Sequence, residues 1–279
     1  MTGVGRLLHG TSSWSAPGWK GVFYPPDMRP ADFLAHYAAQ FPTVEADVTY
    51  YRVPGTGMVR GWDRKTPETF ILSAKFPRAI VHAGDSRRPD PEKILVAETV
   101  WQETRMFLDA MDGLGHKCGP LVLQFPYFAR SVFAEPMEFL ARLDRFLERL
   151  PGRFRYAVEV RNRNWIAEPL LEVLRRHGAA LVLADLPYMP HPEDLPGQIN
   201  LLTADFAYIR LIGDRRAVEA RTRTFDRIVI DRLPRLERWA GFIRHLMERT
   251  GTVFVYANNH FAGHAPATIG RLADLVLSV

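Results

Sequence analysis

The sequence predicts an α/β protein, a single (β/α)8 TIM-like barrel that takes up residues 1–279. Three observations support this prediction. Eight short apolar segments alternate with segments of helical periodicity along the whole chain. Strands that are separated by helices pair in parallel, because each crossover needs a helix. Nearly every predicted strand also ends in a charged or amide residue, and a barrel brings such strand ends together at one mouth.

The predicted strands are short runs of mostly aliphatic and aromatic residues. They span Leu7–Thr11, Thr43–Val48, Phe70–Lys75, Leu121–Gln124, Arg155–Val160, Ala180–Ala184, Phe206–Leu211 and Val253–Tyr256. A polar residue at the end of a buried strand is costly unless it has a partner or a function. The ends of these strands are therefore where we expect the functional site.

The predicted helices carry apolar side chains at every third or fourth position. The pattern is clearest in Pro136–Leu150, where Phe139, Leu143 and Phe146 share one stripe, and in Leu233–Arg249. Shorter helices are predicted over Ala31–Gln40, Val59–Arg64, Pro91–Asp112, Ala167–His177 and Ala265–Leu277. A doubly wound open sheet is the alternative fold. It would normally place a glycine-rich phosphate turn after the first strand, and Gly10-Thr-Ser-Ser-Trp14 is not such a turn.

Three connections are longer than a barrel needs, and they follow strands three, six and seven. They are Phe76–Asp90, Leu186–Asn200 and Gly213–Arg232, of which the last is rich in arginine. Because all three follow strands, we expect them at the mouth of the barrel as lids or substrate walls.

Composition indicates a globular protein with a substantial core, since 47% of the residues are hydrophobic and 24% are charged. No apolar run is long enough to span a membrane. Because Cys118 is the only cysteine and no signal segment is recognisable, we expect a cytoplasmic protein. The net charge of +5 favours an anionic partner. The basic residues are scattered along the chain, so a small anionic molecule is favoured over nucleic acid.

The alternation of side chains along three strands predicts that ionisable groups enter the lumen. Glu45 and Asp47 share one face of the second strand, Lys75 lies on the equivalent face of the third, and Glu159 and Arg161 on that of the fifth. The opposite faces carry aliphatic residues that suit packing under helices. We also place Asp185 and Arg210 in the lumen, at the ends of strands six and seven.

Two interpretations of these charges are open. They form either an internal ion-pair network, which is a poor source of net stability, or a working site. In the second case Glu45 and Glu159 are the predicted proton-handling pair. Lys75 is then the third predicted catalytic residue, as a base or Schiff-base amine, with a simple charge partnership to Glu45 as the alternative.

The predicted binding residues are suited to an anion. Arg161 and Arg210 can grip a carboxylate or phosphate in a bidentate manner, or they can orient the glutamates. Asn258, Asn259 and His260 form a loop after the last strand, where barrels often bind phosphate; the alternative is that the amides cap their own backbone. The other predicted substrate-binding residues are Trp14, Tyr50, His82, Gln124 and Asp185.

A metal site is not predicted, because no strand ends in histidine and no closely spaced His/Cys motif is present. An all-carboxylate Mg²⁺ or Mn²⁺ site from Glu45, Asp47, Glu159 and Asp185 is the alternative left open. The sequence does not identify a cofactor or an oligomeric state, and it carries no nucleophile elbow, P-loop or kinase signature.

Several segments, taken in order along nearly the whole chain, resemble the domain of unknown function 72 family (YecE-like). They include Gly10-Thr-Ser-Ser-Trp14, Phe23-Tyr24-Pro25, Lys75-Phe-Pro-Arg78, Gly119-Pro-Leu-Val-Leu-Gln124, Val158-Glu159-Val-Arg161, Tyr208-Ile-Arg210-Leu and Asn258-Asn-His260-Phe. The resemblance implies a TIM-like barrel and implies no established activity. The chain departs from the family pattern at Asp47, which replaces an asparagine, and at Asn162 and Ile212, which replace histidines.

These observations predict an enzyme that uses acid–base chemistry on a small anionic substrate, a sugar or a phosphorylated compound. The fold does not choose among hydrolase, isomerase and lyase chemistry. One alternative is a protein that binds nucleic acid or processes phosphodiesters. The other is a non-catalytic binding or scaffold protein that keeps a polar lumen for its structure.

Overall fold

Eight parallel strands form one sheet in the computed structural model, which describes residues 5–83, 89–195 and 199–278. The order of the strands is β1-β8-β7-β6-β5-β4-β3-β2. Their bounds are β1 (Arg6–Thr11), β2 (Thr43–Ala46), β3 (Ile71–Lys75), β4 (Cys118–Gln124), β5 (Tyr156–Glu159), β6 (Ala180–Asp185), β7 (Phe206–Leu211) and β8 (Thr252–Ala257). All eight predicted strands are therefore present.

The sheet curves into a nearly closed barrel. The two terminal strands of the order, β1 and β2, meet through a parallel bridge between Ser12 and Glu45, and the Ser13 amide donates to the Glu45 carbonyl at 2.8 Å. The pairing of β5 with β6 is short, with Ala157 opposite Ala180 and Val158 opposite Leu181. The prediction of a (β/α)8 TIM-like barrel is confirmed.

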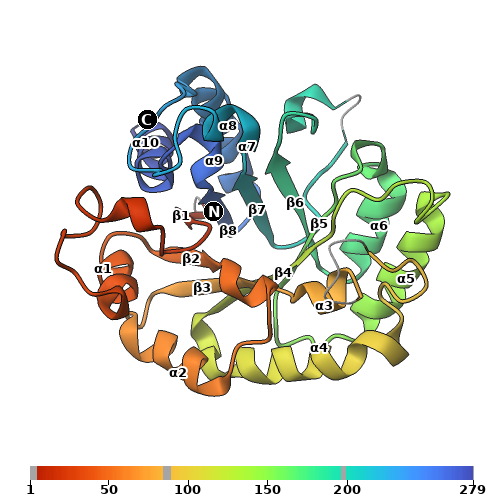
Figure 1. The fold of residues 1–279 in the computed structure, drawn as a ribbon. Helices are drawn as coiled ribbons and strands as arrows, with labels where there is room; N and C mark the ends of the chain where they lie inside the picture. Colours follow the sequence, from red (N-terminus) through yellow and green to blue (C-terminus); the bar gives the residue numbers. More distant parts are fainter. Residues whose placement is uncertain (1–4, 84–88, 196–198, 279) are drawn as a thin grey trace.

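Helices surround the strands, as Figure 1 shows, and both chain ends lie on the side of α10. The bounds are α1 (Phe33–Ala38), α2 (Thr56–Lys65), α3 (Arg78–Val81), α4 (Ala97–Met111), α5 (Pro136–Arg149), α6 (Glu168–Arg176), α7 (Arg215–Glu219), α8 (Leu233–Met247), α9 (Asn259–Ala262) and α10 (Ala265–Leu277). Proline near the start of α5 and α8 suits the first helical turn, where its missing N–H costs nothing. The predicted stripe of α5 is buried at Phe139, Leu143 and Phe146.

Several boundaries differ from the prediction by one to six residues, and two of the differences have a clear local cause. Strand β2 ends at Ala46 rather than Val48, because the Thr49 hydroxyl donates to the Ala46 carbonyl and turns the chain into a short 3-10 helix, Asp47–Tyr50. Helix α4 begins at Ala97 rather than Pro91, because Leu95 has a positive φ of 57° that a helix does not accept. Between β6 and β7 the described residues contain a 3-10 turn, Pro192–Asp194, and no α-helix.

The strands separate two cores. The outer core lies between strands and helices and contains the predicted outward residues Val44, Leu72 and Val158. The lumen holds a second cluster, which comprises Leu8, Val122, Ala157, Ala180, Val182, Phe206, Tyr208, Phe254 and Tyr256. The predicted alternation is thus confirmed, and the lumen is a packed core below the mouth, as in other barrels of this size.

The three long connections lie where the strands end. Helix α3 occupies part of the first, the 3-10 turn part of the second, and α7 part of the third; residues 84–88 and 196–198, within the first two, lie outside the described residues. None of the described helices combines the length and the apolar character that crossing a bilayer requires.

Candidate functional site: a charged pocket at the barrel mouth

A pocket of about 1060 Å³ opens at the carboxyl ends of the strands. Every strand from β2 through β8, or the loop that follows it, contributes to its lining. Of the predicted site residues, the lining includes Tyr50, Lys75, His82, Gln124, Arg161, Arg210, Asn258 and His260. The topology therefore gathers in one place side chains that are far apart in the sequence.

Arg210 forms the floor of this pocket and is almost completely buried, with 2% of its surface exposed. Its Nε lies 3.0 Å from Glu45 Oε2, and its Nη1 donates to Gln124 Oε1 at 2.8 Å and to Glu159 Oε2. Parity along β7 explains this position, because Tyr208 and Arg210 lie on the same face of the strand and Tyr208 is in the lumen cluster.

Two more cations join the same carboxylates. Lys75 Nζ contacts Asp47 Oδ1 and lies 3.2 Å from Glu45 Oε1. Arg161 Nε donates to Glu159 Oε1 at 3.0 Å. Three cations and three carboxylates thus form one continuous network across β2, β3, β5 and β7.

The electrostatics of the network keep both glutamates ionised. Burial alone raises the pKa of Glu45, but the charges of Arg210 and Lys75 more than offset it and lower the pKa to about 2. The pKa of Glu159 is lowered in the same way, because Arg210 and Arg161 outweigh its burial. Conversely, the two carboxylates outweigh burial at Arg210 and raise the pKa of its guanidinium.

A layer of hydroxyl groups lies beneath the charges. Tyr208 donates its hydroxyl hydrogen to Glu45 Oε2 at 2.8 Å. The Tyr256 hydroxyl lies 2.8 Å from both Thr43 Oγ1 and Ser73 Oγ. Burial raises the pKa of both tyrosines, so they remain neutral donors that separate the ionic network from the apolar lumen.

The upper wall of the pocket is strongly basic. Arg78, Arg215 and Arg216 line it, whereas Asp214 is the only carboxylate that its lining adds to Asp47. Tyr50 and His82 also line the pocket and form a pair, with 3.0 Å between the tyrosine hydroxyl and His82 Nε2. Burial raises the pKa of Tyr50. The pocket therefore suits an anion and offers it hydroxyl and imidazole groups.

In the segment after β8, Asn258 and His260 line the pocket, and Asn258 also caps the backbone of α9. Asn258 caps α9: its Oδ1 accepts from the His260 backbone N–H at 3.0 Å and lies 2.8 Å from His260 Nδ1. His260 Nε2 lies 3.2 Å from Glu219 Oε1, and burial lowers the pKa of the imidazole. Both residues face the pocket, although the contact between them is of the backbone-capping kind that the alternative interpretation expected.

Three predicted binding residues are not in this pocket. Trp14 packs edge-to-face on Trp62, at 5.6 Å between ring centroids. Asn259 Oδ1 accepts from Trp19 Nε1 at 3.2 Å and from the Ala265 amide at 3.0 Å, so it joins the loop after β1 to α10. In both cases a contact with a neighbouring helix or turn engages the side chain outside the pocket lining.

Asp185 is the clearest correction, because it does not enter the lumen. Its Oδ2 accepts from Arg235 Nε at 2.6 Å and from Trp239 Nε1 at 2.5 Å, both on α8. The reason is the parity of β6: Ala180 and Val182 face the lumen, so Asp185 belongs with outward-facing Leu181 and Leu183. The four-carboxylate metal site fails with it, and the described residues contain no other cluster of His, Cys, Asp or Glu suited to a metal ion.

Sequence reasoning missed part of the pocket. Arg78, Tyr188, Arg215 and Arg216 line it but were not predicted as site residues. Arg78 follows the end of β3 by three positions, and the two later arginines follow β7, so proximity to strand ends was an available signal. Tyr188 follows the end of β6 by three positions, so the same signal was available there.

The fold and the mouth define the chain as a TIM-like barrel with a charged pocket at the carboxyl ends of its strands. The family described as "Protein of unknown function DUF72" matches residues 8–278. The chain belongs to this family, as the resemblance predicted.

Relatives agree with this assignment. The chain is 33% identical over 159 residues to the UPF0759 protein YecE of Escherichia coli K12, a match over 57% of this chain and 50% of YecE. The chain thus spans about half the length of the YecE proteins that it matches. It is 23% identical over 271 residues to the UPF0759 protein YunF of Bacillus subtilis 168, a match over 93% of this chain and 92% of YunF.

Solved structures give the same fold. A DUF72 family protein of Thermotoga maritima MSB8 superimposes with a TM-score of 0.69 at 27% identity, over 97% of this chain and 98% of the other. A DUF72 family protein of Enterococcus faecalis V583 superimposes with a TM-score of 0.66 at 19% identity, over 97% of this chain and 95% of the other. The second likeness concerns the fold alone.

Proposed function

We propose that the mouth pocket binds a small anionic substrate, a sugar or a phosphorylated compound, and that the protein is an enzyme that acts on it by acid–base chemistry. The observation that carries the proposal is the excess of cations around one cavity. Lys75, Arg78, Arg161, Arg210, Arg215 and Arg216 line the pocket. Four of them pair with Glu45, Asp47, Glu159 or Glu219, whereas among the described residues no ion pair engages Arg78 or Arg216, and Asp214 is the only further carboxylate in the lining. An anion balances that excess, and the low-dielectric walls of the pocket strengthen the attraction.

Arg161 is the arginine whose position best suits binding of the anion. Its Nε is held by Glu159, and among the described residues no hydrogen bond engages its Nη1 and Nη2. Its side chain keeps 27% of its surface exposed, so the free edge of the guanidinium is accessible from the pocket. A guanidinium held along one edge is suited to bidentate binding of phosphate or carboxylate by the other.

The proton-transfer groups in this proposal are imidazoles rather than glutamates. Glu45 and Glu159 have lowered pKa values and are fully buried, so they hold Arg210, Arg161 and Lys75 in place. The Tyr50–His82 pair and His260 line the open cavity, where an imidazole within reach of a substrate can accept or donate a proton. Lys75 contacts two carboxylates, which supports the charge-partner interpretation over a Schiff base.

One observation favours a second candidate, a non-catalytic binding or scaffold protein. The three cations Lys75, Arg161 and Arg210 are matched by three carboxylates, so the lower network is balanced without any ligand. The two candidates differ in whether an anion binds at Arg78 and Arg216, the arginines above that network that have no ion pair among the described residues.

Calorimetric titration with inorganic phosphate tests the binding. We expect the wild-type protein to bind phosphate and Arg161→Ala to bind it on the order of tenfold more weakly, because a charge-assisted hydrogen bond is lost. Arg155→Ala is the matched control: it removes the same charge next to the other end of β5, where the side chain is 49% exposed, and should bind as the wild type does. An unchanged affinity for Arg161→Ala contradicts the proposed site.

Turnover is tested by incubation with a panel of sugar phosphates and mass spectrometry of the products. We expect His82→Gln to retain phosphate binding and to lose turnover of any substrate found, on the order of 100-fold, as removal of a general acid or base does. Phosphate binding without turnover of any compound would leave the scaffold candidate.

A further inference from the structure

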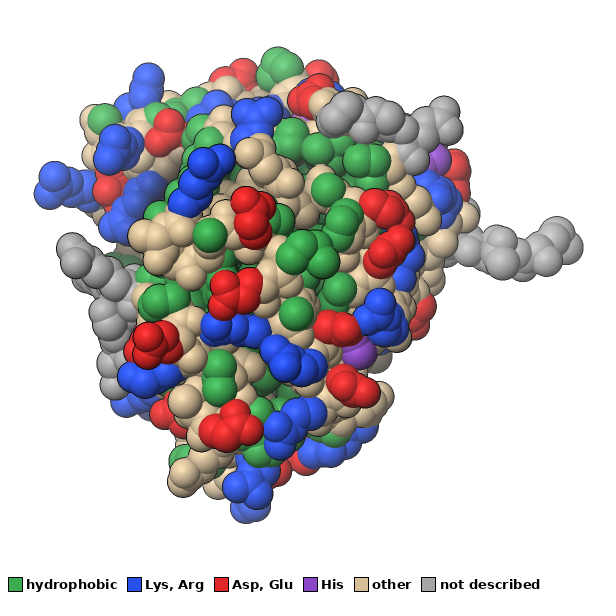
Figure 2. Space-filling view, turned by 90° about the vertical axis from the view of Figure 1, so that its right-hand side faces the viewer, with side chains coloured by type: hydrophobic (Ala, Val, Ile, Leu, Met, Phe, Trp, Pro, Cys, Tyr) green, Lys and Arg blue, Asp and Glu red, His purple; other side chains and the backbone are tan. Residues whose placement is uncertain are grey.

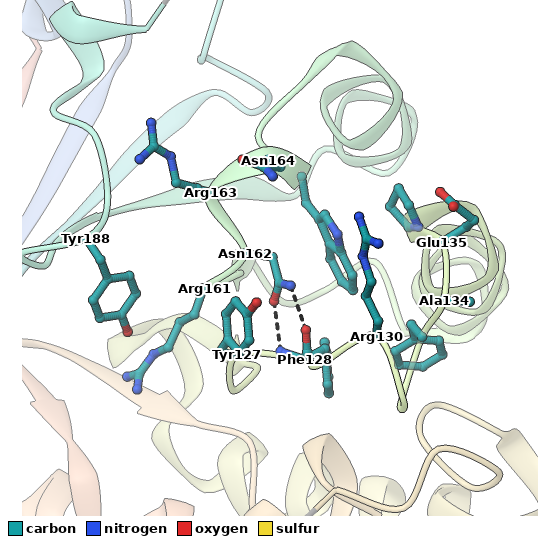
Figure 3. Close-up of a pocket in the computed structure, with 13 residues that line it drawn as sticks. Tyr127, Phe128, Arg130, Ala134, Glu135, Arg161, Asn162, Arg163, Asn164 and Tyr188 are labelled. Atoms are coloured by element: carbon teal, nitrogen blue, oxygen red, sulfur yellow. Dashed lines mark hydrogen bonds between the residues drawn. The ribbon is translucent and has the colours of Figure 1, made fainter.

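A second cavity of about 790 Å³ lies next to the mouth pocket, formed mainly by the loops after β4 and β5 (Figure 3). Arg161 and Tyr188 line both cavities. In Figure 3 these two side chains lie at one end of the second cavity, and Arg130, Ala134 and Glu135 lie at the other. The anion site and this cavity therefore adjoin at Arg161 and Tyr188.

Two aromatic rings in the second cavity are open to solvent. Tyr127 is 64% exposed and Tyr188 is 49% exposed. Their neighbour Phe128 is 2% exposed and stacks on Trp165 at 5.7 Å with an interplanar angle of 27°. The hydrophobic core thus uses Phe128 and leaves the faces of the two tyrosines for something else, such as a planar partner.

The frame of this cavity is fixed by one side chain. The Asn162 amide donates to the Phe128 carbonyl at 2.8 Å and accepts from the Phe128 amide at 2.9 Å, as the dashed lines in Figure 3 show. This pair of bonds ties the loop after β5 to the loop after β4. Tyr127, directly before Phe128, is therefore presented from an anchored backbone, which lowers the entropy lost on binding.

Polar groups line the cavity around the rings. Arg130, Arg163 and Asn164 are exposed there, and Arg161 stands at the junction with the anion site. Aromatic faces flanked by arginines and an amide recognise a flat, polar heterocycle that is attached to a negative charge. The volume falls within the range of small-ligand sites.

We propose that the substrate is a nucleoside phosphate, which binds across the two cavities with its phosphate at Arg161 and its base against Tyr127 and Tyr188. The inference rests on the proposed anion site and names the substrate class for it. A sugar phosphate without a base would occupy the mouth alone.

The test compares ligands that differ in the ring. Calorimetry is done with inorganic phosphate, ribose 5-phosphate and the four common ribonucleoside 5′-monophosphates. We expect at least one nucleotide to bind about tenfold more tightly than ribose 5-phosphate, which is the size of effect that stacking of one base gives. Tyr127→Ala should abolish that advantage and leave the affinity for inorganic phosphate unchanged.

Two further variants protect the result against a folding artefact. Tyr127→Phe keeps the ring and should keep the nucleotide advantage. Met137→Ala, at a neighbouring α5 position that is 60% exposed but outside the cavity lining, should also keep it.

The outcomes separate the two proposals. Equal binding of ribose 5-phosphate and all nucleotides, or an unchanged nucleotide advantage in Tyr127→Ala, overturns the nucleoside inference and leaves the anion site standing. If neither phosphate, ribose 5-phosphate nor any nucleotide binds the wild-type protein, both proposals are wrong.

Discussion

At the scale of single residues, Glu45 is a fully buried carboxylate that connects three side chains of the mouth. Its carboxylate accepts from Arg210 and Tyr208 and lies 3.2 Å from Lys75 Nζ, and none of its surface is exposed. Taking such a carboxylate out of water costs several kcal/mol, which the two cations and the tyrosine offset. Removing the charge therefore leaves two buried cations short of a partner.

The lowered pKa of Glu45 predicts how stability depends on pH. The ordinary value is 4.5 and the folded value is about 2, so its contribution is complete above pH 4.5 and is lost as the pH falls towards 2. The difference corresponds to on the order of 3 kcal/mol. Urea denaturation followed by tryptophan fluorescence at a series of pH values measures it.

Glu45→Gln provides the comparison for this pH series. We expect the variant to be less stable than the wild type at pH 7, by about 3 kcal/mol, because Arg210 and Lys75 lose a charge partner. Between pH 4.5 and 2 its stability should fall less steeply than that of the wild type. Parallel curves for the two proteins would show that Glu45 does not titrate with the proposed shift.

The sequence predicted the location of most of the site residues but not of all of them. Glu45, Lys75, Glu159 and Arg210 were placed correctly in the lumen because a strand allows only two side-chain directions. Asn259 was predicted as a binding residue but is not in the pocket, because it begins the short helix α9, where the alternation of a strand no longer fixes the direction of the side chain.

At the scale of elements, a polar residue at the end of β6 binds helix α8 outside the barrel instead of lining the pocket. Asp185, the last residue of β6, anchors α8 through Arg235 and Trp239. Of the three, Arg235 is 38% exposed at its side chain and Asp185 is nearly buried. The strand end that was predicted to serve the pocket instead fastens a helix to the sheet.

We predict that Asp185→Ala separates structure from binding. It should lower the free energy of unfolding by about 2 kcal/mol, since the buried Trp239 N–H loses its acceptor and the ion pair to Arg235 is partly screened. The affinity for phosphate should stay that of the wild type, by calorimetry on the same samples. Arg235→Ala should cost less stability, and a loss of phosphate binding in Asp185→Ala would return Asp185 to the site.

Element boundaries were predictable where periodicity alone sets them. Strand β7 and helix α10 have the predicted bounds, because strong hydrophobic patterns run to their ends. Strand β2 was predicted too long, because a single Thr49 hydroxyl bond turns the chain at Asp47. Short-range side-chain bonds of this kind leave little trace in a sequence.

At the scale of the whole molecule, charge is distributed rather than gathered into a band. The face in Figure 2 carries lysines and arginines interspersed with aspartates and glutamates. Ion pairs such as Arg238 with Asp194 and Arg153 with Asp112 neutralise part of the surface. A net charge of +5 over 279 residues is then a weak attraction for a polyanion, which favours the small-anion proposal over nucleic acid.

The corresponding prediction concerns salt. We expect a fluorescently labelled DNA of about 20 nucleotides to bind weakly and to be released between roughly 50 and 200 mM salt, since such binding depends on counterion release. Phosphate should retain most of its affinity over that range. Anisotropy and calorimetry measure the two, and tight DNA binding at the higher salt would favour the nucleic-acid alternative.

The overall architecture was the part that the sequence predicted best. Eight alternating units and polar strand ends allow few folds other than a barrel. The second cavity beside the mouth was not predicted, because it arises from packing between the loops after β4 and β5, through Asn162 and Phe128. Contacts between irregular segments are set by the assembled structure rather than by a repeat along the chain.

The bridge between β1 and β2 gives Glu45 one more consequence. Its backbone carbonyl accepts from Ser13 at the join of the barrel, while its carboxylate grips Arg210 inside. The same residue therefore closes the ring of strands through its backbone and holds Arg210, the floor of the pocket, through its side chain. The junction with the fewest paired residues, the single bridge between β1 and β2, therefore lies directly beside the candidate site.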